Sequence, residues 1–113
     1  MRYLMLGAAP LAAMLSAAAM ADEPPRFQIN IKDHKFQPKE LRVPANRAFV
    51  IEVHNDDSTA EEFESSDLGV EKVIAGGRRL PIRVRPLAPG RYSFMGEYHS
   101  DTATGTIIVE NAN

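Results

Sequence analysis

The segment "FMGEYHSDTATG", residues 94–105, gathers three chemically different metal donors. Within five residues it offers the Met95 sulfur, the Glu97 carboxylate and the His99 imidazole. A loop that leaves a strand lets donors converge that strict strand alternation would keep apart. The grouping favours half of a metal site, and the alternative is an exposed polar loop beside a methionine that fills a gap in the core.

A second candidate donor comes from the acid-rich stretch "NDDSTAEEFESSD", residues 55–67. If Phe63 faces the core, alternation places Glu61 on the same face and directs Glu62 and Glu64 outward. A carboxylate on the core side is costly unless a cation or hydrogen-bond donors meet it. Glu61 is therefore the first acid to consider, although a one-residue slip of register would put Glu62 in its place.

Other chemistries find little support in the sequence. The chain has no cysteine, which excludes thiolate metal sites, cysteine nucleophiles and disulfides. No serine has a histidine and an aspartate at recognisable spacing, and no glycine-rich phosphate loop occurs. His34 lies beside a predicted turn with nothing specific around it, and His54 is expected to be an exposed strand-end residue. The basic run at 78–85 is typical of a solvated face or of a docking surface for an acidic partner.

Residues 1–21 have the layout of a secretory signal peptide, with Arg2, an apolar stretch and the small-x-small ending before a cleavage site after Ala21. A retained N-terminal anchor is the alternative, but Pro10 interrupts a stretch already short for a bilayer crossing. Cleavage leaves residues 22–113 as one exported, periplasmic domain with no membrane span. The loss of Arg2 changes the formal net charge from -2 to -3. This acidic balance argues against nucleic acid as a partner.

The elements that must position these residues are strands, because apolar residues of the remaining chain alternate with a period of two. Turn-forming residues separate the alternating segments, as at Asn55–Ser58 and Pro89–Gly90. The segments lie at 27–31, 40–43, 47–53, 61–65, 69–74, 81–85, 91–95 and 104–110. Seven or eight short strands in a chain of this length predict an all-β fold, a Greek-key β-sandwich.

Two long stretches, "FQPKELRVPANRAFVIEVHNDDSTAEEF" and "LAPGRYSFMGEYHSDTATGTIIVE", resemble a cupredoxin, the exported copper-binding β-sandwich. Carried over position by position, the resemblance places the first histidine ligand of that family at Glu61 and the cysteine at Gly96. The second histidine corresponds to His99, and the axial methionine falls near Ala103. Because a blue copper site needs the thiolate, that chemistry is not expected here.

The resemblance leaves a carboxylate–imidazole donor set as the expected metal site. Glu61 and His99 form its centre, with Glu97 or Glu62 as further oxygen donors. Met95 is expected to point away from the buried pocket and to act as a rim ligand or not at all. Oxygen donors combined with imidazole suit iron or Cu(II), so copper and/or iron is the implied ion.

The altered pattern is similar to the cupredoxin-like domains that accompany bacterial high-affinity iron permeases. This resemblance implies a periplasmic component that assists Fe(II) oxidation or hands iron to the permease. The implied partners are the membrane iron permease, a second periplasmic metal-binding protein and a ferredoxin-type membrane protein. Any ferroxidase-type activity would require those partners. The alternatives are a non-redox copper or iron carrier and a metal-free adaptor sandwich.

Overall fold

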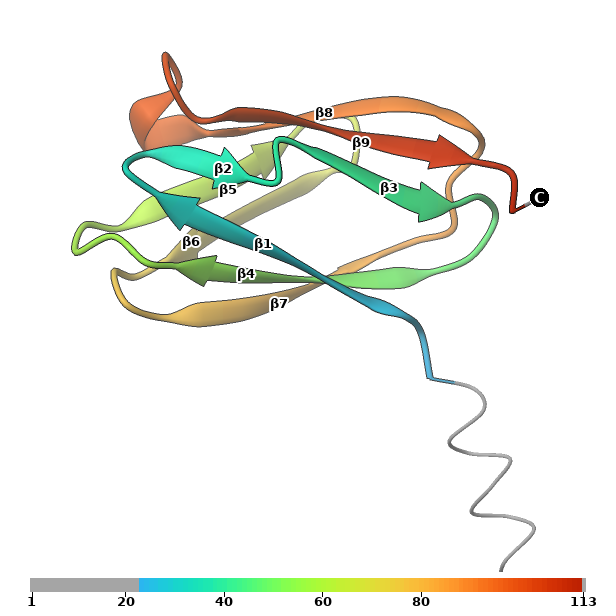
Figure 1. The fold of residues 1–113 in the computed structure, drawn as a ribbon, viewed down its shortest axis with the longest axis horizontal. Helices are drawn as coiled ribbons and strands as arrows, with labels where there is room; N and C mark the ends of the chain where they lie inside the picture. The colour runs from blue at the N-terminus through green and yellow to red at the C-terminus, as the bar shows by residue number, and fades with distance from the viewer. Residues whose placement is uncertain (1–22, 113) are drawn as a thin grey trace, which may run out of the picture.

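Alternating apolar residues place one face of each strand in a shared core between two β-sheets (Figure 1). The computed structural model describes residues 23–112, so the predicted signal peptide at 1–21 lies outside the described residues. In the part of the chain that is described, no helix is long and apolar enough to cross a membrane. The all-β sandwich predicted from the sequence is confirmed.

The first sheet has four strands in the order β2-β1-β4-β7, with β1 and β4 parallel. These strands are β1 (Arg26–Lys32), β2 (Lys35–Gln37), β4 (Phe49–Asn55) and β7 (Arg79–Val84). The second sheet has five strands in the order β3-β9-β8-β5-β6, with β3 and β9 parallel. These are β3 (Glu40–Pro44), β5 (Glu61–Ser65), β6 (Val70–Ile74), β8 (Gly90–Gly96) and β9 (Thr104–Glu110).

The expectation of seven or eight strands is one too low, because the described residues form nine. The missed strand is β2, which has three residues and a single buried side chain, Phe36. A segment that short cannot display alternation, and it forms because it pairs with β1 across a two-residue turn.

Three phenylalanines fix the part of the core that lies nearest the candidate site. Phe63 of β5 stacks on Phe94 of β8 with ring centroids 5.0 Å apart, and Phe36 meets the Phe94 ring edge-on at 4.9 Å. All three rings are buried. Because Phe63 is locked inward, its alternate neighbours Glu61 and Ser65 must also face inward.

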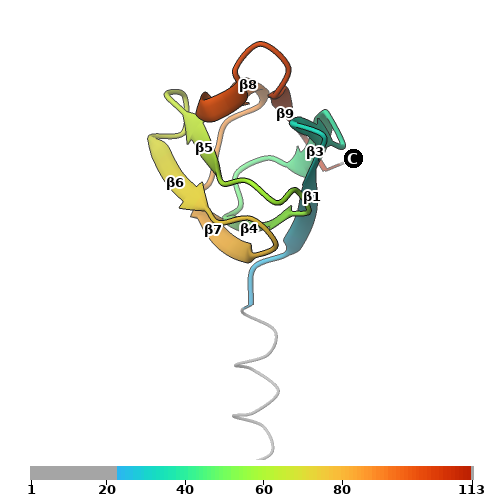
Figure 2. The same ribbon diagram turned by 90° about the vertical axis from the view of Figure 1, so that its left-hand side faces the viewer.

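One end of the sandwich collects the segments that carry the candidate residues. The β1–β2 turn, the β4–β5 loop and the short 3-10 helix η1 (Glu97–His99) all lie at this end, which faces the viewer in Figure 2. Residues far apart in sequence are therefore brought together by the topology.

Candidate metal centre

Glu61 is the first inward-facing residue of β5, and its side chain is almost completely enclosed, with 1% of the residue exposed. The neighbouring Glu62 and Glu64 are half-buried on the opposite face. The pairing of Phe63 with Gly96 of β8 fixes this register. The sequence made Glu61 the first acid to consider but left Glu62 open through a slip of register, and the structure resolves this in favour of Glu61.

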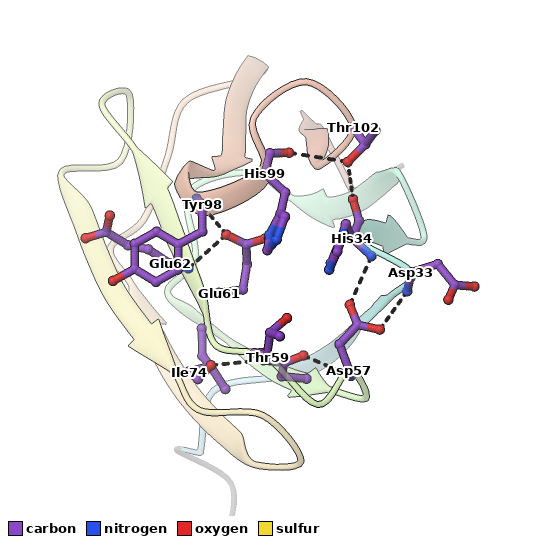
Figure 3. A network of polar contacts seen from close by, with 11 residues as sticks. Asp33, His34, Asp57, Thr59, Glu61, Glu62, Ile74, Tyr98, His99 and Thr102 are labelled. Carbon is purple, nitrogen blue, oxygen red and sulfur yellow. Dashed lines mark hydrogen bonds and ion pairs between the residues drawn. The ribbon is translucent and has the colours of Figure 1, made fainter.

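The Glu61 carboxylate accepts three hydrogen bonds (Figure 3). Its Oε1 accepts from the backbone N–H of Glu62 at 3.0 Å and from that of Tyr98 at 2.9 Å. Its Oε2 lies 2.6 Å from Nδ1 of His99. Because an ionised carboxylate can only accept, Nδ1 carries the proton and the lone pair of a neutral His99 ring is on Nε2. Glu61 thus sets both the orientation and the tautomer of His99.

The small residues Gly96 and Ala103 close the space around this carboxylate. A Cβ atom at position 96 would lie 2.6 Å from Cδ of Glu61 and 2.7 Å from Cβ of Ala103. Positions 61, 96, 99 and 103, which the resemblance matched to copper ligands, therefore meet at one place. A blue copper centre does not fit these residues, because Glu61 fills the space that a cysteine at position 96 would need. An imidazole–carboxylate metal site does fit, since both donor types are present and adjacent.

His34 belongs to the same end of the molecule, and its ring stacks on that of His99 with centroids 3.5 Å apart and planes 11° from parallel. The expectation that nothing specific surrounds His34 is therefore wrong. The contact joins the β1–β2 turn to the segment after β8, and local sequence around His34 gives no sign of it. Only the topology of the sandwich brings the two turns together (Figure 3).

A group of acids separate from Glu61 lies on the outer face of the five-stranded sheet. One carboxylate oxygen from each of Glu62, Glu64 and Glu71 lies within 4.8 Å of the other two. A side-chain hydrogen bond with Glu97, partial burial and the charges of the neighbouring acids raise the pKa of Glu64 to about 7. The pKa of Glu62 is also raised, first by partial burial and then by the charges of the nearby acids. We call Glu62, Glu64, Glu71 and Glu97 the outer acid cluster.

The predicted metal residues are thus divided between two places. Glu61 and His99 lie together inside the end of the sandwich, whereas Glu62 and Glu97 belong to the outer acid cluster. Met95 is paired with Glu64 across the strands and is 37% exposed, so it points away from Glu61 as alternation predicts. It lines a shallow cavity of about 360 Å³ together with Glu64 and Glu97.

His54 lies on the outer face of the other sheet and is not part of either group. Its side chain is only 19% exposed, so the expectation of an exposed residue is wrong. Its Nε2 is buried without a hydrogen-bond partner and lies 3.7 Å from Oε1 of Glu52. Burial follows from its position in the sheet, because Asn30 and Arg79 flank it on the two neighbouring strands.

Comparisons with known proteins agree with this architecture. The chain matches the sequence model of the cupredoxin-like domain over residues 4–109. It is 45% identical over 84 residues to the uncharacterized protein RP394 of Rickettsia prowazekii, covering 74% of this chain and 67% of the relative.

Solved structures show the same fold at low sequence identity. The metal-binding domain of the Cu(I)-exporting P-type ATPase CopA of Streptococcus pneumoniae has a TM-score of 0.70 at 16% identity, covering 80% of this chain and 90% of that domain. The blue copper protein auracyanin A of Chloroflexus aurantiacus has a TM-score of 0.67 at 15% identity, covering 78% and 100%. The periplasmic domain of cytochrome oxidase subunit II of Bradyrhizobium japonicum has a TM-score of 0.64 at 16% identity, covering 77% and 84%. From the family match and the shared fold, the protein belongs to the cupredoxin-like domain family.

Proposed function

We propose that the protein is an exported, periplasmic component of a bacterial iron uptake system that binds copper and/or iron at Glu61 and His99. In this role it assists Fe(II) oxidation or hands iron to a membrane iron permease. The observation that carries the proposal is the Glu61–His99 pair, which occupies the positions matched to cupredoxin copper ligands and replaces the thiolate with a carboxylate. The resemblance to permease-associated domains supplies the link to iron.

Hydrogen bonds within the chain hold the Glu61–His99 pair in a fixed arrangement. Glu61 is held by the backbone N–H groups of Glu62 and Tyr98, so its carboxylate cannot swing away from His99. His99 and Glu61 would hold the ion, with the imidazole as nitrogen donor and the carboxylate as oxygen donor or as the hydrogen-bond partner that orients the ring. A copper ion bound there would supply one-electron redox chemistry.

Iron as cargo has a second binding place in the outer acid cluster. Hard carboxylate oxygens favour Fe(III) over Fe(II), so oxidation and binding reinforce each other. The pKa of Glu64 is raised first by a side-chain hydrogen bond with Glu97 and by partial burial, and then by the charges of Glu97, Glu71 and Glu62. A bound cation would offset those like charges. Glu61 and Glu62 are adjacent on β5, so the two binding places lie on opposite faces of one strand.

Oxidation of Fe(II) also needs an electron acceptor, and we assign that role to a partner protein rather than to a residue of this chain. The membrane iron permease and a second periplasmic metal-binding protein are the partners in this scheme. A carrier without redox chemistry uses the same residues. The metal-free adaptor is favoured by one observation, namely that Glu61 is fully hydrogen-bonded by protein groups alone.

Metal titration separates these functions. Metal-free protein is titrated calorimetrically with Cu(II), and with Fe(II) under anaerobic conditions, alongside His99→Ala and Glu61→Gln. The proposal predicts binding by the wild type and weakened Cu(II) binding by both variants. His54→Asn is the matched control, because it removes a histidine from the opposite sheet and leaves both binding places intact.

Three outcomes are decisive. Failure of the wild type to bind either ion contradicts both metal functions and leaves the adaptor. Binding of Cu(II) without consumption of added Fe(II), measured with a ferrous chelator in the presence of an electron acceptor, removes the redox role and leaves the carrier. Equal Cu(II) affinity of the wild type and His99→Ala places the ion elsewhere.

A further inference from the structure

We infer that His34 is a second imidazole ligand of the ion bound by His99, so that the centre is made of two histidines and Glu61. The inference rests on the proposed function, because it concerns the same site. It adds a residue from the β1–β2 turn, which is not one of the positions that the cupredoxin resemblance matched to ligands.

The backbone of the β1–β2 turn has a conformation that fixes where the His34 side chain begins. The two residues between the strands, Asp33 and His34, have φ angles of 55° and 60°. Both lie in the left-handed region, which few non-glycine residues adopt and in which Asn, Asp and His are the most frequent of them. The two-residue turn between paired strands therefore fixes the direction in which the His34 side chain leaves the backbone.

Two side chains hold this turn in place from other parts of the fold. Asp57 accepts hydrogen bonds from the N–H groups of Asp33 at 2.8 Å and His34 at 2.9 Å. Thr102 donates its hydroxyl to the carbonyl oxygen of His34 at 2.8 Å and also lies 3.4 Å from the carbonyl oxygen of His99. The turn and the His99 segment are therefore tied directly to each other (Figure 3).

These restraints act on the backbone of His34 and leave its ring available. Within residues 23–112 the hydrogen bonds of His34 involve only its main chain, and its ring contacts that of His99. The backbone hydrogen bonds thus hold the His34 ring against the His99 ring, and within the described residues its ring nitrogens have no hydrogen-bond partner.

The His34 and His99 rings are stacked and nearly parallel. The nitrogen lone pairs of two stacked rings lie in two parallel planes and do not converge on one point between the rings, so a shared ion requires one ring to rotate. His99 is held by Glu61, whereas His34 is half-buried on a turn and can rotate about its side-chain bonds without moving the backbone. Two imidazoles and one carboxylate are a donor set for Fe(II) and suit Cu(II) as well.

Copper spectroscopy tests the inference, with Cu(II) alone as the probe. Pulsed electron paramagnetic resonance counts the coordinated imidazoles, and a competing chelator gives the affinity. The wild type is expected to show two imidazoles. His34→Asn, which suits a left-handed turn, and His34→Phe, which preserves the ring stack, are expected to show one. Their Cu(II) affinity should fall by at least the ~10- to 100-fold that loss of an outer-shell partner costs.

The outcomes distinguish this inference from the function on which it rests. His54→Asn should keep two imidazoles and wild-type affinity. A single imidazole in the wild type, with unchanged affinity in both His34 variants, overturns the role of His34 and leaves the Glu61–His99 site standing. No Cu(II) binding by the wild type overturns both. Thermal unfolding checks folding, and His34→Asn should be at least as stable as the wild type because Asn tolerates the left-handed turn.

Discussion

Glu61 and Glu64 lie on the same strand, yet their carboxylates have opposite surroundings. Glu61 is 1% exposed and receives hydrogen bonds from two backbone N–H groups and one imidazole. Glu64 lies among other acids, and its pKa is raised to about 7. One acid is already satisfied in the absence of an ion, and the other is held among like charges.

The surroundings of the two carboxylates suit them to different roles. The inner carboxylate acts through His99, because its hydrogen bond to Nδ1 orients the imidazole. In the outer acid cluster the oxygens lie close to one another and neighbouring acids raise the pKa values of Glu62 and Glu64, so we expect a cation to offset their charges. The alternation of a single strand separates this outer group from the buried Glu61 carboxylate.

Removing the inner carboxylate should have the largest effect. Glu61→Ala leaves the N–H groups of Glu62 and Tyr98 and the His99 ring without their acceptor, which should lower the free energy of unfolding by about 3 kcal/mol. Urea denaturation measures this loss. The matched variant Glu62→Ala, one residue away on the outer face, should change it by less than ~0.5 kcal/mol. Equal losses of unfolding free energy in Glu61→Ala and Glu62→Ala would show that the inner and outer faces of β5 do not differ in this respect.

Crowding the inner carboxylate should have the next largest effect. Gly96→Ala places a methyl group against Glu61 and Ala103 and should cost about 1–3 kcal/mol. Gly96 has ordinary extended dihedral angles, φ -95° and ψ 107°, so the cost is steric and not conformational. In a Glu61→Ala background the cost should be smaller, since the close contacts with the Glu61 carboxylate are removed while that with Ala103 remains. Strictly additive losses in this double-mutant cycle would show that Glu61 does not fill the space.

The outer acid cluster should make the stability of the protein depend on pH. The pKa of Glu64 is raised from 4.5 to about 7, so the folded state holds a proton that the unfolded state releases. Stability should therefore fall as pH rises through this window, and the penalty should be complete above it. Glu64→Gln should flatten the dependence in urea unfolding at a series of pH values. If Glu64→Gln keeps the wild-type dependence of unfolding free energy on pH between 4.5 and about 7, the raised pKa does not belong to Glu64.

Replacing the outward-facing methionine should have the smallest effect. Met95 is 37% exposed and faces the outer acid cluster, so Met95→Leu should change stability by less than ~0.5 kcal/mol. Cu(II) affinity should stay unchanged, because the thioether points away from His99. A clear loss of Cu(II) affinity in the same chelator competition would instead make Met95 a ligand.

Strand alternation was sufficient to predict the sandwich and made Glu61 the first candidate for the inward face, although a one-residue slip of register left Glu62 open. Phe63 must be buried, and a carboxylate two residues before it on a strand shares its face. The same reasoning placed Met95 outside. Position matching to the cupredoxin pattern identified Gly96 and Ala103, whose small size now has a reason in the Glu61 side chain.

Strand alternation could not predict contacts between turns that are far apart in the sequence. The stack of His34 on His99 depends on how the β1–β2 turn sits against the segment after β8, and no local periodicity encodes it. The separation of Glu97 from Glu61 has a similar cause. Glu97 begins η1, where the chain leaves strand geometry, so alternation no longer says which way its side chain points.

Binding of Cu(II) by Glu61 and His99 is tested most directly by a crystal structure grown with Cu(II), with the ion located by anomalous scattering. We predict a peak about 2 Å from a ring nitrogen of His99, next to Glu61. A peak found solely among Glu62, Glu64 and Glu71, with the 2.6 Å contact between His99 and Glu61 intact, would contradict it.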